Sequence, residues 1–190
     1  REGHEFQIGP TGIVGAQQSA QLLGWDLKRL NTSNQTVESV RLDPAAISYE
    51  TASYTRWSEF LARFEVIARE GLGQLTDIAD LSVVTLEYVD RFVFEGDPAD
   101  ADPRSLFPSL QGMLHEDALS GVALWHLHRG WFEKQDGRNV LVNQNLDAQQ
   151  ADIPQRGPTR SVQVLTKTEL RDLPPDVDYS ALKPQISQMH

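Results

Sequence analysis

One segment of the chain has the spacing of an amphipathic helix, and β-type runs lie on both sides of it. Between Thr55 and Glu70 the apolar residues recur at helical intervals: Trp57, Phe60, Leu61, Phe64, Ile67 and Ala68. Such a stripe marks a helix that packs one face against a core. We expect Thr55 to be the N-cap and Gly71 to end this helix. One strong helix among strands favours an α+β fold.

The residues before this helix predict mostly strands. We expect a strand over His4–Gly9, a short helix over Gly15–Gly24 and a strand that begins at Trp25. The run from Thr36 to Ser53 reads as two strands. We place the turn between them at Asp43-Pro44, because Asp caps its own turn and Pro fixes φ.

The residues after the helix repeat this order. Leu81–Gly96 reads as a long strand because it is rich in Val, Phe and Tyr. An acidic loop and a short helix over Ser105–Asp117 follow. The remaining segments predict three strands and a final helix that the end of the sequence cuts short: 121–134, 138–146, 160–170 and 173–190. A tight turn at Gln135–Gly137 joins the first two of these strands.

Both halves therefore read as β-α-β-β-β-α. We predict a single, internally duplicated domain with halves at about 1–80 and 81–190. The two units would form one broad antiparallel sheet with the helices on one face, by analogy with folds like that of the TATA-binding protein. A shared fold does not transfer function.

The composition of the chain limits the classes of partner and the cellular environment that we expect. Of the 190 residues, 27 are acidic and 17 are Lys or Arg, so the net charge of −10 disfavours nucleic acid. No run of apolar residues is long enough to span a membrane. The chain has no Cys, which excludes disulfides and suits a cytoplasmic location. It begins with Arg1 and not Met, so we expect a processed or incomplete chain.

Two histidines are the strongest candidates for metal-binding or catalytic residues. His126 and His128 lie two positions apart in the predicted strand "ALWHLHRGW", so they face the same way. They could be half of a zinc site, but such a site needs three or four converging ligands, and the spacing identifies no others. The alternative is a packed or partner-facing strand, and we favour it.

Other candidates are aromatic or charged. Trp125 and Trp131 share a strand face that is either core or binding surface. Arg91, beside Asp90 and near Tyr88, lies inside an apolar strand. It either forms a structural ion pair with Asp90 or Glu87, which we favour, or binds an anion in a groove.

Three blocks of the sequence resemble a sporadically distributed prokaryotic family of unknown function. They are the hairpin and helix "VRLDPAAISYE" and "YTRWSEFLARF", the strand "LEYVDRFVF", and the late pair "VLVNQNL" and "RSVQVLTKTEL". The resemblance covers about Trp25 to Leu170 and implies a strand with Tyr-x-Asn-Arg. Here Asp90 stands where Asn is usual. The family has no established activity to carry over.

The sequence thus leaves three function hypotheses. The first is a non-enzymatic binding or assembly module without a cofactor, which takes a protein partner or a small ligand or associates with itself. Tyr88, Asp90, Arg91, Trp125 and Trp131 are its candidate binding residues. The second is a metal-dependent hydrolase that uses His126 and His128. The third is a protein associated with defence or a toxin–antitoxin pair. Classical P-loop, nucleophile-elbow and H-E-x-x-H motifs are absent.

Overall fold

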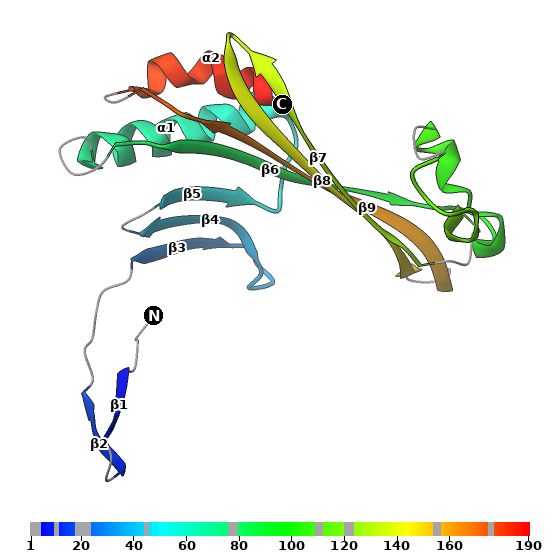
Figure 1. Cartoon of the computed structure of the whole chain (residues 1–190), viewed down its shortest axis with the longest axis horizontal. Coiled ribbons are helices and arrows are strands. Elements are labelled where there is room, and N and C mark those ends of the chain that lie inside the picture. The colour runs from blue at the N-terminus through cyan, green and yellow to red at the C-terminus, as the bar shows by residue number, and fades with distance from the viewer. Residues whose placement is uncertain are drawn as a thin grey trace. The chain divides into compact units, whose positions relative to one another are not determined.

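A computed structural model describes residues 5–9, 12–17, 24–43, 46–75, 80–108, 112–119, 124–153, 157–174 and 177–190. The chain divides into two compact units, residues 1–79 and 80–190. Each unit contains antiparallel strands and one α-helix (Figure 1).

The first unit contains a hairpin, a three-stranded sheet and a helix. Strands β1 (Glu5–Gly9) and β2 (Gly12–Gln17) pair with each other. Strands β3 (Trp25–Leu30), β4 (Thr36–Asp43) and β5 (Ala46–Thr51) form a meander in chain order. The prediction of a helix from Gly15 is wrong as far as Gln17, because these residues extend a strand that pairs with β1; residues 18–23 lie outside the described part. The Pro of the predicted turn at Asp43-Pro44 also lies outside it.

The helix of the first unit, α1 (Trp57–Leu75), confirms the amphipathic stripe but not its predicted end. It continues through Gly71 for one more turn. A Cβ built on Gly71 would lie 2.7 Å from Cδ1 of Ile47 on β5. Gly71 is therefore a point of close helix–sheet approach and not a C-cap, and the missing side chain makes this approach possible.

Glu38 on β4 joins all the elements of this sheet and helix. Its carboxylate accepts hydrogen bonds from Arg29 Nε of β3 at 2.9 Å and from the Tyr49 hydroxyl of β5 at 3.1 Å. Arg63 Nη2 of α1 lies 3.5 Å away. The hydrogen bond from Arg29 is the main reason that the pKa of Glu38 falls to about 2, and the bond from Tyr49 adds to it.

The second unit is a four-stranded antiparallel sheet with the order β6-β9-β8-β7. Its strands are β6 (Val83–Val93), β7 (His126–Gln135), β8 (Arg138–Ile153) and β9 (Gly157–Arg171). Asp136 and Gly137 join β7 to β8 with φ values of 49° and 80°. Two consecutive residues with positive φ are typical of a type I′ hairpin, so the predicted tight turn is confirmed.

The two faces of this sheet differ in burial. On the face that we call the core face, Leu86, Val140, Leu146, Val164 and Leu170 are buried. Helix α2 (Tyr179–Met189) lies at one end of the sheet, and the segment with the 3-10 turns lies at the other (Figure 1). The opposite face, here called the open face, carries Arg91, His126 and His128, which are all exposed.

Side chains on α2 and in the 3-10 segment cover the core face. Tyr179, Leu182, Ile186 and Met189 form the buried side of α2. At the other end of the sheet, Phe107 and Leu114 pack against a cluster of buried residues, namely Leu146, Val162 and Val164.

The α+β class with antiparallel sheets is confirmed. The described strands form separate sheets, so the duplicated unit and the single broad sheet stay predictions. The short helix predicted over Ser105–Asp117 is wrong in the described part. This region contains instead the 3-10 turns η2 (Pro103–Ser105) and η4 (Glu116–Leu119), with a positive φ at Gly112 between them. Neither described α-helix combines the length and apolarity needed to cross a membrane.

The Glu38 cluster predicts how acid affects the first unit. A carboxylate with a depressed folded-state pKa stabilises the fold above its ordinary value of 4.5, and this contribution is lost as the pH falls towards about 2. Glu38→Gln should therefore lower the urea midpoint above pH 4.5, and the difference from wild type should shrink as the pH approaches 2. Circular dichroism during urea titration measures this.

Glu70→Gln is the matched control, because Glu70 is an exposed carboxylate on α1. It should leave the midpoint unchanged across the same pH range. Equal midpoints for wild type and Glu38→Gln above pH 4.5 would show that the cluster does not stabilise the unit.

Candidate functional site

A row of four side chains crosses the core face at the end of the sheet. Phe92 of β6 lies opposite Val162 of β9, which lies opposite Ala148 of β8. The Ala148 N–H donates to the carbonyl of Trp125, just before β7, at 2.9 Å. Residues directly opposite each other in an antiparallel sheet share a face, so these side chains form one apolar surface.

The 3-10 segment forms a wall beside this row, and two Asp-Pro steps shape it. Asp97 caps η1 (Pro98–Asp100) through the Ala99 N–H, and Asp102 caps η2 through the Arg104 N–H. In both turns Pro occupies the start of the helix, where no N–H is needed. Asp97 and Asp102 of the acidic loop therefore act as caps.

Asp102 accepts hydrogen bonds within this wall through both its side chain and its backbone carbonyl. Arg104 Nη2 lies 2.7 Å from Asp102 Oδ2, and the Ser105 hydroxyl donates to the Asp102 carbonyl at 2.7 Å. The hydrogen bonds from Arg104 lower the pKa of Asp102. Pro103, in the same turn, is buried and lines the pocket.

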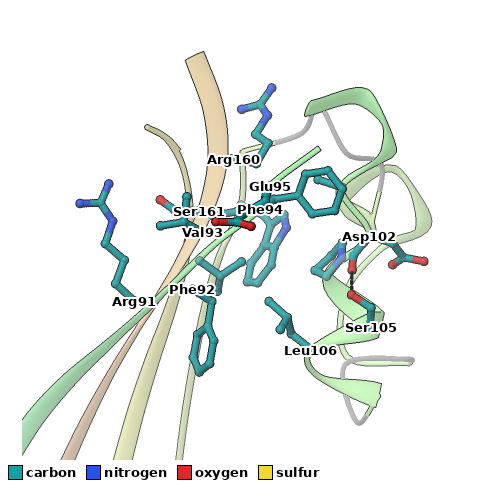
Figure 2. Close-up of a pocket in the computed structure, with 15 residues that line it drawn as sticks. Arg91, Phe92, Val93, Phe94, Glu95, Asp102, Ser105, Leu106, Arg160 and Ser161 are labelled. Atoms are coloured by element: carbon teal, nitrogen blue, oxygen red, sulfur yellow. Dashed lines mark hydrogen bonds between the residues drawn. The ribbon is translucent and has the colours of Figure 1, made fainter. Parts of the chain in front are cut away.

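A pocket of about 390 Å³ lies between the row and the wall. Figure 2 shows Leu106 of the wall facing Phe92 across it. Phe92 and Leu106 remain 38% and 47% exposed, so their apolar surface is open to a ligand. The charged residues at the lining, Arg91, Arg160, Glu95 and Asp102, balance in sign. The lining is therefore more apolar than polar, and its formal charges sum to zero.

The pocket brings together two of the five predicted binding residues, Arg91 and Trp125. Trp125 is half-buried and packs on the Leu146 cluster. Tyr88 and Asp90 lie further back along β6 and do not line the pocket. The Tyr88 ring instead lies 6.2 Å from that of His190, at the end of α2.

Arg91 differs from the interpretation favoured from the sequence. It is exposed and makes no ion pair with a described residue, so the expected pair with Asp90 or Glu87 is not formed. The physical reason is strand geometry: Asp90 faces the opposite side of β6, and Glu87 lies four residues away along an extended strand. The Arg91 guanidinium extends away from the apolar centre of the pocket (Figure 2).

Trp131 shares a face with Trp125 but has a different environment. Its Nε1 donates to Glu133 Oε1 at 2.7 Å, and the Arg129 guanidinium lies 5.3 Å from its ring centroid. Arg129 also donates to Gln144 Oε1 from Nη2 at 2.6 Å. These contacts hold Trp131 within the sheet and away from the pocket.

The two histidines lie side by side on the open face, as their spacing predicts, and both are exposed. His126 lies opposite Asp147, and His128 lies opposite Asn145, on β8. His126 Nδ1 is 2.6 Å from Asp147 Oδ1, and His128 Nδ1 bonds Asn145 Oδ1. Neither ring is in the core, so the partner-facing strand is the part of the favoured alternative that stays a prediction.

These contacts limit what the histidines can bind. Each Nδ1 already has a partner on β8, which leaves Nε2 of each ring directed outward. Among the described residues, no three His, Asp or Glu side chains gather so that they could hold a metal ion.

The sequence interpretation missed Phe92, Leu106, Ala148 and Val162. Phe92 and Val162 carry the alternation of a half-buried strand, which indicates a core face but not a pocket. Leu106 was assigned to a helix. Only the pairing of β6 with β9 and of β9 with β8 brings these positions together.

Comparison with known proteins adds no assignment, because no family model, curated protein or solved structure matches the chain.

Proposed function

We propose that this protein is a non-enzymatic binding module that takes an uncharged, apolar or aromatic ligand group in the pocket between the end of β6 and η2. The observation that carries the proposal is the pocket of about 390 Å³, lined by Phe92, Leu106 and Trp125. This volume is in the range of small-molecule sites, which are mostly apolar with a few polar groups.

The lining indicates the ligand class. Aromatic side chains favour edge-to-face or offset contacts, and Phe92 already makes a perpendicular contact with Phe107, with ring centroids 5.5 Å apart. Asp102 is already paired with Arg104, and the Arg91 guanidinium extends away from the centre of the pocket (Figure 2), so the centre presents no free charge to a ligand.

Filling the pocket tests this proposal. The neutral fluorescent probe N-phenyl-1-naphthylamine should bind the wild-type protein and brighten in the apolar interior. Leu106→Trp places a larger side chain in the pocket and should weaken probe binding roughly tenfold, or about 1.4 kcal/mol. Fluorescence titration measures the dissociation constants.

Leu124→Trp is the control, because Leu124 is also an exposed leucine but does not line the pocket. It should bind the probe like wild type. A probe that binds wild type and Leu106→Trp equally would show that it occupies another place, and the pocket proposal would fail.

The metal-dependent hydrolase is a second candidate because of one observation. The Asp147 carboxylate at His126 Nδ1 resembles the outer-shell carboxylates that orient metal-binding histidines. His126 and His128 would bind the metal ion through Nε2. A third ligand would have to come from outside the described residues.

Metal analysis distinguishes this candidate from the binding module. Protein purified without chelators should contain no stoichiometric metal if the binding module is correct. His126→Ala combined with His128→Ala should then change the free energy of unfolding by no more than about 0.5 kcal/mol, as is usual for exposed positions. Stoichiometric zinc or iron in wild type, lost in the double variant, would favour the hydrolase.

We further propose that the two units are copies of one pattern. The support is that each contains a three-stranded meander followed by a helix: β3-β4-β5-α1 and β7-β8-β9-α2. If so, residues 80–190 expressed alone should unfold cooperatively. A fragment without a cooperative transition would contradict the duplication.

A further inference from the structure

Strand β6 has one paired edge and one edge without a described partner. It pairs with β9, and within the described part of the chain no strand pairs with its other side. The strand is long, from Val83 to Val93, and its register with β9 has no bulge. It contains neither Lys nor Pro, two residues that proteins use to protect such edges. β6 is therefore a template for another strand.

The backbone shows which residues would bind that strand. The Phe94 N–H donates to the Arg160 carbonyl of β9 at 2.9 Å. Backbone groups alternate in direction along a strand, so the N–H and C=O groups of Glu87, Val89 and Arg91 point away from β9. These three residues also share the open face of the sheet.

Their side chains are available for a partner. Glu87 and Arg91 are exposed and form no ion pair with a described residue, and Val89 is 52% exposed. A positive and a negative charge thus lie on either side of an exposed valine, two residues away in each direction. This arrangement is self-complementary under a twofold rotation.

We propose that β6 pairs antiparallel with β6 of a second copy of this chain, with Val89 opposite the second copy's Val89. This register places Glu87 of each copy opposite Arg91 of the other. The dimer has two such ion pairs, one on each side of the twofold axis. On the core face, Leu86 lies opposite Phe92 of the other copy.

Neighbouring registers are worse because of charge. A shift that centres the pair on Asp90 places two aspartates opposite each other, and centres on Glu87 or Arg91 do the same for two glutamates or two arginines. A centre on Tyr88 leaves Glu87 opposite Val89 and Arg91 opposite Thr85. Like charges directly opposite are destabilising and opposite charges stabilise, so the register centred on Val89 is selected.

The other edge of the sheet is a poorer match. On β7, the Arg129 guanidinium already bonds Gln144, and Glu133 accepts from Trp131. β7 also contains the exposed Lys134, a residue type that protects sheet edges, whereas β6 contains no Lys. The unpartnered pair of Glu87 and Arg91, with its opposite charges, therefore distinguishes β6 from β7.

Charge exchange tests the dimer on the full chain. Sedimentation equilibrium and native mass spectrometry should give wild type a concentration-dependent mass of twice the 21.3 kDa chain. Glu87→Arg and Arg91→Glu should each weaken dimerisation roughly tenfold or more, because each replaces two attractive pairs by two repulsive ones. An equal mixture of the two variants should restore the dimer, with one chain of each kind.

The double variant Glu87→Arg/Arg91→Glu is the folding control, since it restores opposite charges at both pairs and should dimerise like wild type. A wild type that is monomeric throughout would overturn the proposal, as would dimers that tolerate either single change, or a mixture that stays monomeric. Glu87 does not line the pocket. Probe binding by Glu87→Arg therefore reports on the pocket separately from the dimer.

Discussion

The antiparallel pairing of β8 with β9 is the constraint on which the second unit depends. It runs without interruption from Val140 opposite Leu170 to Ile153 opposite Gly157. These two long strands form the centre of the sheet and determine the register of both outer strands. The side chains of β6 and β7 share faces with these central strands through their own registers with β9 and β8, because residues opposite each other lie on the same side of the sheet.

The two ends of the core face are covered by different elements. The end near Val140 and Leu170 is buried, and α2 packs there. The end near Val162 and Ala148 is covered by short 3-10 turns, which leave a pocket beside Phe92. Short turns cover less area than a helix, so the sheet extends beyond its covering at this end.

The alternation of β6 separates its two proposed roles. Phe92 faces the pocket side, while Glu87, Val89 and Arg91 face the open side and direct their backbone groups to the free edge. A ligand in the pocket and a second copy at the edge would therefore use different groups of one strand. Arg91 and Val93 are the exceptions. They lie on the open side of β6 at its free edge, and they also line the pocket.

Local sequence patterns predict most of the helices and strands. Periodicity predicted α1 and most strands, and the Asp-Gly turn predicted the β7–β8 hairpin, because these depend on neighbours within a few residues. It also placed His126 and His128 side by side. The sequence predictions were wrong where distant contacts matter: Gly71 lies inside α1 at a close approach to Ile47, and Gly15 to Gln17 pair with β1.

The pocket depends on contacts between residues that are distant in the sequence. Phe92, Val162, Ala148 and Trp125 come from four strands or their ends, and no local pattern relates them. The strand pleat likewise explains why the predicted ion pair of Arg91 does not form. It directs Asp90 to the other face of β6, away from the Arg91 guanidinium. Local backbone preferences act over one or two turns of chain, whereas a pocket or an edge depends on register between strands, which the sequence specifies only through the whole fold.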